Sequence, residues 1–326
     1  MRWRGSLATL ACVCGSAAPL RAQDSDSLVL RLAAMTAVTG FEDAMADSVR
    51  ALLAGSVSDR AGNVVWRSGS GEPVRVAVCP LDEVGYVVGA VTGEGYLTLR
   101  RVGATAMGPL FDQFIEGQRV TVFGRRGAVP AVVGVRSTHL QRGRPAGADE
   151  PFSLDAAYVD VGASSPAEVA ALGVELLAPV ARAKRPYRYG DGLVAAPFAA
   201  QRAACAALLV AALRLRDGPA AGTAVAVFAR RRHFAHDGAG FALTELTGAG
   251  AAAPSVVLLG GAAGPDSLGS GAIVGAADSV LVRRSRMAVA AWALPARYGR
   301  TPVETVALRD ADALARRVIA FWGGAR

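Results

Sequence analysis

The chain has 326 residues, of which 52% are hydrophobic and 19% are charged. A disordered chain would combine lower hydrophobicity with higher net charge, so this composition predicts a folded protein with a sizeable core. The formal net charge is +8, but the sequence shows no arginine-rich helix with interleaved aromatic residues, which argues against nucleic-acid binding.

The N-terminus has the pattern of an export signal over residues 1–22. Two arginines precede an apolar stretch at residues 7–14, and Leu20-Arg21-Ala22 places an apolar and a small residue where a signal peptidase cuts. We therefore expect cleavage near Ala22 and a periplasmic or secreted protein, the alternative being an uncleaved tail. No later stretch is long and apolar enough to span a membrane.

Two cysteines, Cys79 and Cys205, lie beyond this predicted signal. In an exported protein they could form a disulfide. Buried free thiols are also common, and the sequence gives no geometry, so both states stay open.

Helices and strands follow one another in two distinct patterns. Amphipathic helices are predicted at 27–35 and 42–53, and strands at 63–66, 74–78 and 84–91. Residues 86–188 form mostly short strands, predicted at 96–100, 119–123, 131–135 and 157–161, with a helix starting at Ser165-Pro166. This region therefore reads as a β-rich insert.

From residue 189 onward, strands alternate with helices. A long apolar helix is predicted at 201–215, further helices near 239 and at 310–322, and buried strands at 223–229, 255–259 and 288–294. Only a glycine-rich stretch and residues 278–286 connect the last two strands. This alternation predicts an α/β domain with a mainly parallel sheet, built from residues 24–85 and 189–326 and interrupted by the insert.

Six short segments occur in a fixed order along the chain. They are Thr39-Gly40-Phe41-Glu42, Asp59-Arg60-Ala61-Gly62-Asn63, Leu81-Asp82-Glu83-Val84-Gly85-Tyr86, Ala131-Val132-Val133-Gly134 with Ser137-Thr138-His139-Leu140, Tyr158-Val159-Asp160-Val161-Gly162-Ala163-Ser164-Ser165, and Arg297-Tyr298 with Thr301-Pro302-Val303-Glu304. Their order and spacing resemble the co-catalytic metallo-aminopeptidase family that includes the glutamyl, deblocking and tetrahedral aminopeptidases. The resemblance implies a three-layer α/β/α sandwich with an inserted small β-barrel, two divalent metals, a glutamate base and a homo-oligomer.

The same resemblance places the family's metal site on residues that mostly cannot bind a cation. The equivalent positions are Pro80, Asp82, Ala200, Arg232, His233, Gly260 (or Gly261) and Arg300. Two neighbouring divalent cations need carboxylates to offset their repulsion, and histidines to complete their shells. Three of these positions carry no donor atom, and two are arginines, whose charge opposes metal binding. In the family the aspartate equivalent to Asp82 supports the ligands rather than binding metal.

Our leading hypothesis is a catalytically inactive member without a cofactor. Arg202, Arg232, His233 and Arg300 would then converge on the former metal site and bind a carboxylate, a phosphate or a peptide terminus. The competing interpretation is that these arginines form ion pairs with Asp82, Glu83 or Asp237.

Two alternatives remain open. The first is an active metallo-aminopeptidase with one divalent metal, such as zinc, on His233, His236 and Asp237, with Asp82 or Glu83 as a further ligand or base. The second is a structural module that acts through oligomer formation.

Overall fold

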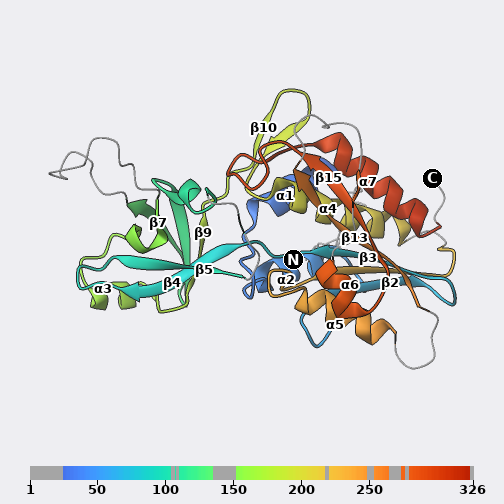
Figure 1. Ribbon diagram of the computed structural model, residues 1–326, viewed down its shortest axis with the longest axis horizontal. Helices are drawn as coiled ribbons and strands as arrows, with labels where there is room; N and C mark the ends of the chain where they lie inside the picture. Colours follow the sequence, from blue (N-terminus) through green and yellow to red (C-terminus); the bar gives the residue numbers. More distant parts are fainter. Residues whose placement is uncertain are drawn as a thin grey trace, which may run out of the picture.

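The computed structural model describes residues 25–103, 107, 110–134, 152–216, 220–247, 253–263, 273–275 and 279–323. The predicted export signal and His139 lie outside these residues. The described chain forms a helix-covered sheet and a β-barrel, which lie side by side along the long axis of the molecule (Figure 1).

A seven-stranded sheet forms the centre of the larger part, in the order β1-β2-β12-β3-β13-β15-β14. In that order the strands span Val57–Ser58, Val64–Gly69, Thr223–Ala229, Val74–Pro80, Ser255–Ala263, Val289–Ala296 and Ile273–Gly275. The four strands from β12 to β15 are parallel, and the outer pairings are antiparallel. These central strands are apolar runs because both of their faces are buried.

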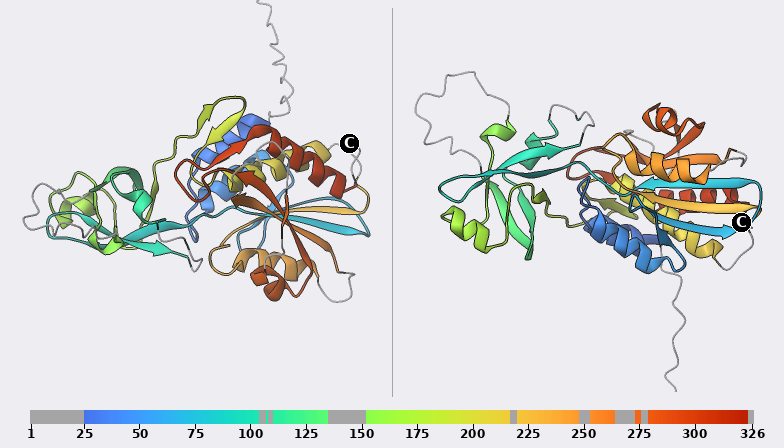
Figure 2. Two further views of the ribbon diagram at one scale, coloured as in Figure 1. Left: turned by 45° about the horizontal axis from the view of Figure 1, so that its top comes forward. Right: turned by 90° about the horizontal axis from the view of Figure 1, so that it is seen from below.

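Helices cover both faces of this sheet (Figure 2). One face packs against α1 (Ser25–Ala34), α2 (Asp43–Leu52), α4 (Ala199–Leu215) and α7 (Leu308–Phe321), and the other against α5 (Asp237–Leu246) and α6 (Ser279–Ser285). Strand β3 serves both cores, because successive strand side chains point to opposite faces: Ala77 and Cys79 to one, Val76 and Val78 to the other. None of the described helices combines the length and apolarity needed to cross a membrane.

A closed barrel forms the smaller part, in the order β4-β5-β8-β7-β6-β9. In that order its strands span Gly85–Val91, Leu97–Val102, Tyr158–Asp160, Gly127–Gly134, Arg119–Gly124 and Pro179–Arg182, with short helices at Gln113–Ile115, Leu154–Ala156 and Pro166–Ala171 (α3). Alternate residues, such as Val120 and Val122 on β6, fill the interior. Helix α3 begins after Ser165, whose side chain accepts a hydrogen bond from the backbone N–H of Glu168, as its sequence predicts.

Some short elements are not evident in the sequence pattern. Strands β10 (Tyr187–Tyr189), β11 (Leu193–Ala195) and β16 (Thr305–Ala307) form a separate antiparallel sheet. The connection between β13 and β15, for which the sequence pattern predicts no helix or strand, contains β14 and α6. Three-residue strands are too short to show a hydrophobic period, so only their tertiary partners define them.

Candidate functional site

A cavity of about 320 Å³ lies at the carboxyl ends of the central strands. Its walls come from the segments that follow β3 and β12, from the ends of β13 and β15, and from the first turn of α4. Met107, from the connection between two barrel strands, also lines the cavity. In open α/β sheets this is where ligands bind.

Most of the predicted site positions meet at this cavity. Its lining includes Asp82, Ala200, Arg232, His233 and Arg300. Gly261 lines it rather than Gly260. Pro80 ends β3, and its carbonyl oxygen accepts a 2.9 Å hydrogen bond from Gln201 Nε2.

The loop after β12 carries Arg232 and His233. Residues of the sequence motifs described above hold its backbone in place. Backbone N–H groups of Arg230, Arg231 and His233 donate to Asn63 Oδ1, Glu42 Oε1 and Asp82 Oδ2 over 2.9, 2.9 and 3.0 Å. Buried acceptors of this kind fix a loop, because leaving the donors unpaired would cost free energy. The motif residues that persist in this chain therefore shape the site.

Asp82, one of the two carboxylates that accept hydrogen bonds from the backbone of this loop, is only 2% exposed. Its Oδ2 also accepts a hydrogen bond from Thr39 Oγ1. Its Oδ1 is buried and has no hydrogen-bond partner among the described residues. Among the residues that the structure describes, no arginine forms an ion pair with Asp82. The ion pair that the sequence suggested for Asp82 is therefore not found.

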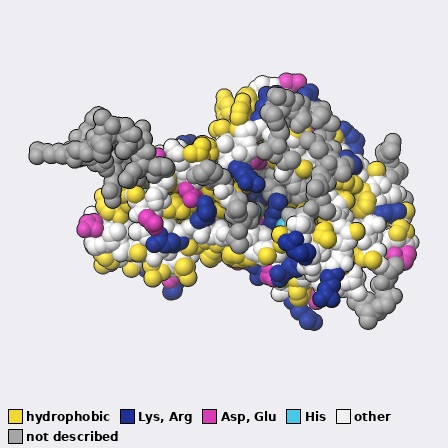
Figure 3. Space-filling view, in the orientation of Figure 1, with side chains coloured by type: hydrophobic (Ala, Val, Ile, Leu, Met, Phe, Trp, Pro, Cys, Tyr) yellow, Lys and Arg dark blue, Asp and Glu magenta, His cyan; other side chains and the backbone are white. Residues whose placement is uncertain are grey.

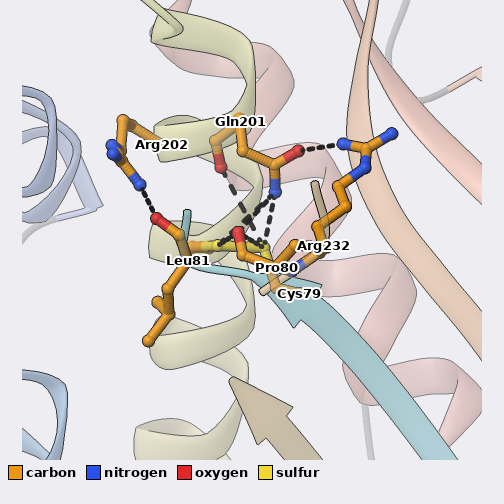
Figure 4. The surroundings of a disulfide bond; sticks show 7 residues. Cys79, Pro80, Leu81, Gln201, Arg202 and Arg232 are labelled. Atoms are coloured by element: carbon orange, nitrogen blue, oxygen red, sulfur yellow. Dashed lines mark hydrogen bonds between the residues drawn. A yellow bond between two sulfur atoms is a disulfide. The ribbon is translucent and has the colours of Figure 1, made fainter. Parts of the chain in front are cut away.

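Arg202 does not face the cavity, and its predicted convergence with Arg232 and Arg300 is wrong. Its Nη1 donates to the carbonyl oxygen of Leu81, and its Nη2 lies 2.7 Å from Glu83 Oε2, on the other side of that segment (Figure 4). Glu83 also binds Lys184 Nζ. A buried guanidinium needs a counter-charge, and here Glu83 supplies it.

This buried cluster shifts the pKa values of its members. Burial by itself raises the pKa of Glu83, but the positive charges of Lys184 and Arg202 outweigh it, so the pKa is lowered. Burial lowers the pKa of Lys184 to about 8, against the opposing effect of Glu83. The cluster joins α4, the segment after β3 and the chain that leaves the barrel.

Arg232 and Arg300 contrast with the other arginines nearby. Neither makes an ion pair with a described residue. Arg232 Nη1 donates a 3.0 Å hydrogen bond to Gln201 Oε1, while the amide nitrogen of Gln201 is held by Pro80 (Figure 4). The adjacent Arg230 and Arg231 are neutralised, by Glu42 with Asp43 and by Asp237, respectively.

His233 is buried against these groups. Burial lowers its pKa to about 4, with Asp82 opposing and Arg232 adding to the shift. The imidazole is therefore neutral near neutral pH. It contributes no charge to the cavity, so the positive charge there comes from Arg232 and Arg300.

A disulfide between Cys79 and Cys205 lies directly beside this site (Figure 4). Both cysteines are buried, with their Cα atoms 5.4 Å apart. The bond joins the end of β3 to α4 across 126 residues of sequence. The two cysteines are therefore bonded rather than free thiols, which the sequence alone left open.

Comparison with other proteins identifies the scaffold. The family described as M42 glutamyl aminopeptidase matches residues 62–288, which is more than half of the chain. The chain belongs to this family.

Individual relatives are similar to this chain in sequence, and solved structures are similar to it in fold. The Escherichia coli protein SgcX is 31% identical over 180 residues, which are 53% of this chain and 46% of SgcX. The curated relatives are thus matched over about half of their length. Among solved structures, aminopeptidase APDkam598 from Desulfurococcus kamchatkensis has a TM-score of 0.79 at 19% identity, covering 92% of this chain and 95% of its own. The TET1 peptidase of Pyrococcus horikoshii is described as assembling into a tetrahedron or a large octahedral shell. Its TM-score is 0.79 at 19% identity, and the match covers 91% of this chain and 99% of its own.

The residues of this M42 protein do not fit the two metals that the family implies. Pro80, Ala200 and Gly260 offer no side-chain donor, and the two arginines are cations. A Cβ at Gly260 would lie 3.5 Å from Gln201 Oε1 and 4.0 Å from Arg232 Nη1, so Arg232 reaches the space beside this position. Among the described residues, no three His, Cys, Asp or Glu side chains group as a metal site.

The alternative single-metal site on His233, His236 and Asp237 is not assembled either. Asp237 forms ion pairs with Arg231, over 3.0 Å, and with Arg284. His233 lines the cavity, whereas His236 does not. Ala235 and His236 have left-handed backbone conformations in the turn that carries the two histidines, which sequence spacing alone does not reveal.

Contacts other than metal coordination tie the elements of this M42 site together. Glu304 Oε1 accepts the backbone N–H of Ala200 over 2.9 Å, and Oε2 that of Arg300 over 2.8 Å. Burial raises the pKa of Glu304, and these two hydrogen bonds and the charge of Arg300 oppose the rise. With the disulfide and Gln201, this carboxyl group joins β3, α4 and the segment before β16.

Three contributors to the site were not singled out as functional in the sequence: Gln201, Glu304 and Lys184. Glu304 ends the last motif, and Lys184 is the only lysine in the chain, so each carried a signal. Gln201 carried none, because one glutamine in an alanine-rich helix has many possible orientations.

Proposed function

We propose that this M42 protein is a non-catalytic member of its family, built on a three-layer α/β/α sandwich, that binds small anions such as carboxylates or phosphates in the cavity. The observation that carries this proposal is the state of Arg232 and Arg300. Both line the cavity and neither forms an ion pair with a described residue, although the charge of Arg300 opposes the rise that burial causes in the pKa of the nearby Glu304. Charge-assisted hydrogen bonds from guanidinium groups to an anion would satisfy them.

Backbone strain around the cavity supports a binding role over simple loss of function. Eight described non-glycine residues have a positive φ, and six of them belong to the segments around the cavity: Phe198, Arg231, Ala235, His236, Tyr298 and Arg300. Each such conformation costs of order 1–3 kcal/mol and clusters at functional sites. A cavity without a role would have no need to keep them.

Export and self-association are parts of the same proposal. Disulfides persist mainly in oxidising compartments, so the Cys79–Cys205 bond supports export. The assembly of the Pyrococcus horikoshii TET1 peptidase supports a homo-oligomer. Light scattering on the purified protein would measure its oligomeric state.

Calorimetric titration with inorganic phosphate tests the anion site. We expect saturable binding that weakens with added salt and is lost in the double variant Arg232→Gln/Arg300→Gln. The matched control is Arg67→Gln, an exposed arginine on β2 outside the cavity. No binding by the unmodified protein would reject the anion site and leave an oligomeric interaction module as the remaining function.

Hydrolysis assays test the absence of catalysis. We expect no release of p-nitroaniline from aminoacyl p-nitroanilides with zinc, cobalt or manganese present. Metal-dependent turnover that disappears in His233→Ala would contradict the proposal and restore an active enzyme.

A further inference from the structure

Two arginines, Arg232 and Arg300, and two carboxyl groups, of Asp82 and Glu304, line the cavity. Asp82 Oδ2 accepts two hydrogen bonds from Thr39 and His233, and its Oδ1 is buried from solvent. Both oxygens of Glu304 accept backbone N–H groups. The carboxylate oxygens are thus occupied by protein donors or buried, whereas the guanidinium groups of Arg232 and Arg300 line the cavity and form no ion pair with a described residue. Basic side chains also gather around the middle of one face of the molecule (Figure 3).

The cavity also has an apolar side. Met107, Phe198 and Ala296 contribute to its lining. Tyr298 and Val303, on the same loop as Arg300, are 58% and 56% exposed. A ligand that satisfies both sides would carry an anionic group next to an apolar substituent.

Size narrows the ligand further. Small-molecule sites span about 300–1,000 Å³, so a cavity of about 320 Å³ is at the small end. It has room for the end of a peptide or for a small carboxylic acid.

These observations decide which end of a peptide would enter. An aminopeptidase receives the amino end of its substrate, but an ammonium group here would face two guanidinium groups. The oxygens of Asp82 and Glu304 that could attract it are buried or already accept hydrogen bonds from the protein. A carboxylate would accept hydrogen bonds from the same groups. We infer that the cavity binds the free carboxyl end of a short peptide, with an apolar terminal side chain against Met107 and Phe198, in the direction opposite to an aminopeptidase substrate. This inference rests on the proposed anion site.

Two peptides and one inorganic ion test it by calorimetry. The first peptide is dialanine with an acetylated amino end and a free carboxylate, the second is dialanine with a free amino end and an amidated carboxyl end, and the ion is phosphate. We expect the acetylated peptide to bind and the amidated one not to bind. Arg232→Gln or Arg300→Gln should each weaken the acetylated peptide about tenfold or more, because a hydrogen bond to a charged group is lost, whereas Arg67→Gln should not.

Each outcome separates this inference from the proposed function. If phosphate binds and the two peptides bind equally well, the anion site stands and the preference for a carboxyl end is wrong. Stronger binding of the peptide with the free amino end would overturn the inference directly. If neither phosphate nor the acetylated peptide binds, the proposed function fails as well.

Discussion

The arginines on the two sides of the segment from Cys79 to Glu83 differ in whether a described acid pairs with them. On one side, Arg202 is 1% exposed and paired with Glu83, which also binds Lys184. On the other side, Arg232 and Arg300 line a cavity and pair with no described acid. The first arrangement is typical of a structural cluster and the second of a binding site, although the same residue type forms both.

The largest effect is expected where charges are paired and buried. Glu83→Gln would leave Lys184 and Arg202 as buried cations without their counter-charge. Removing one partner of a buried ion pair costs about 3–5 kcal/mol, so the free energy of unfolding should fall by that amount in urea titration. The control is Asp155→Asn, whose ion pair with Arg100 is exposed and should contribute about 0–1 kcal/mol. Equal losses in both variants would mean that Glu83 does not organise the cluster.

The disulfide should have the next largest effect. Cys79→Ser combined with Cys205→Ser removes a cross-link that closes a long loop of chain. Native disulfides typically contribute about 2–4 kcal/mol, so the free energy of unfolding should fall by that amount without reductant. An unchanged value, or free thiols detected in the unfolded wild-type protein, would show that the bond is absent in solution.

Lys184, in the buried cluster with Glu83 and Arg202, should make the free energy of unfolding depend on pH. Burial lowers its pKa to about 8, whereas an unfolded chain holds this proton up to about pH 10.4. Between these values the unfolded state binds more protons, so raising the pH stabilises the folded state. We expect the free energy of unfolding to rise by about 1–3 kcal/mol from pH 8 to about pH 10, relative to Lys184→Met. Parallel pH profiles for the two proteins would contradict this expectation.

The smallest effect is expected when a carboxylate is introduced beside Arg232, so that this cavity arginine becomes paired. Gln201→Glu places a carboxylate against Arg232, which should weaken phosphate binding about tenfold by neutralising that guanidinium. Gln201→Met removes the hydrogen-bond acceptor of Arg232 but leaves the charge of Arg232 unpaired by any new acid. It should therefore weaken phosphate binding less than Gln201→Glu does. If the two variants bind phosphate equally, the charge of Arg232 is not what the ligand meets.

The sequence could predict where the site lies better than what each residue does there. The order of strands and motifs brings Ala200, Arg232 and His233 to the same strand ends, and the structure places them together. Gln201 and Arg202 are adjacent on α4 and so point about 100° apart around the helix. Which of them faces the cavity depends on how the helix is rotated after the left-handed residue Phe198, a tertiary detail without a sequence signal. Lys184 follows the last barrel strand and contacts Glu83, which is 101 residues earlier in the chain, so no local pattern predicts that contact.

The central claim is that arginine charge occupies the place of the metals. The most direct test is the metal content of the purified protein after incubation with excess zinc and removal of unbound metal. Our account predicts that no stoichiometric zinc is retained. Zinc retained in a stoichiometric amount, and lost in His233→Ala, would contradict it.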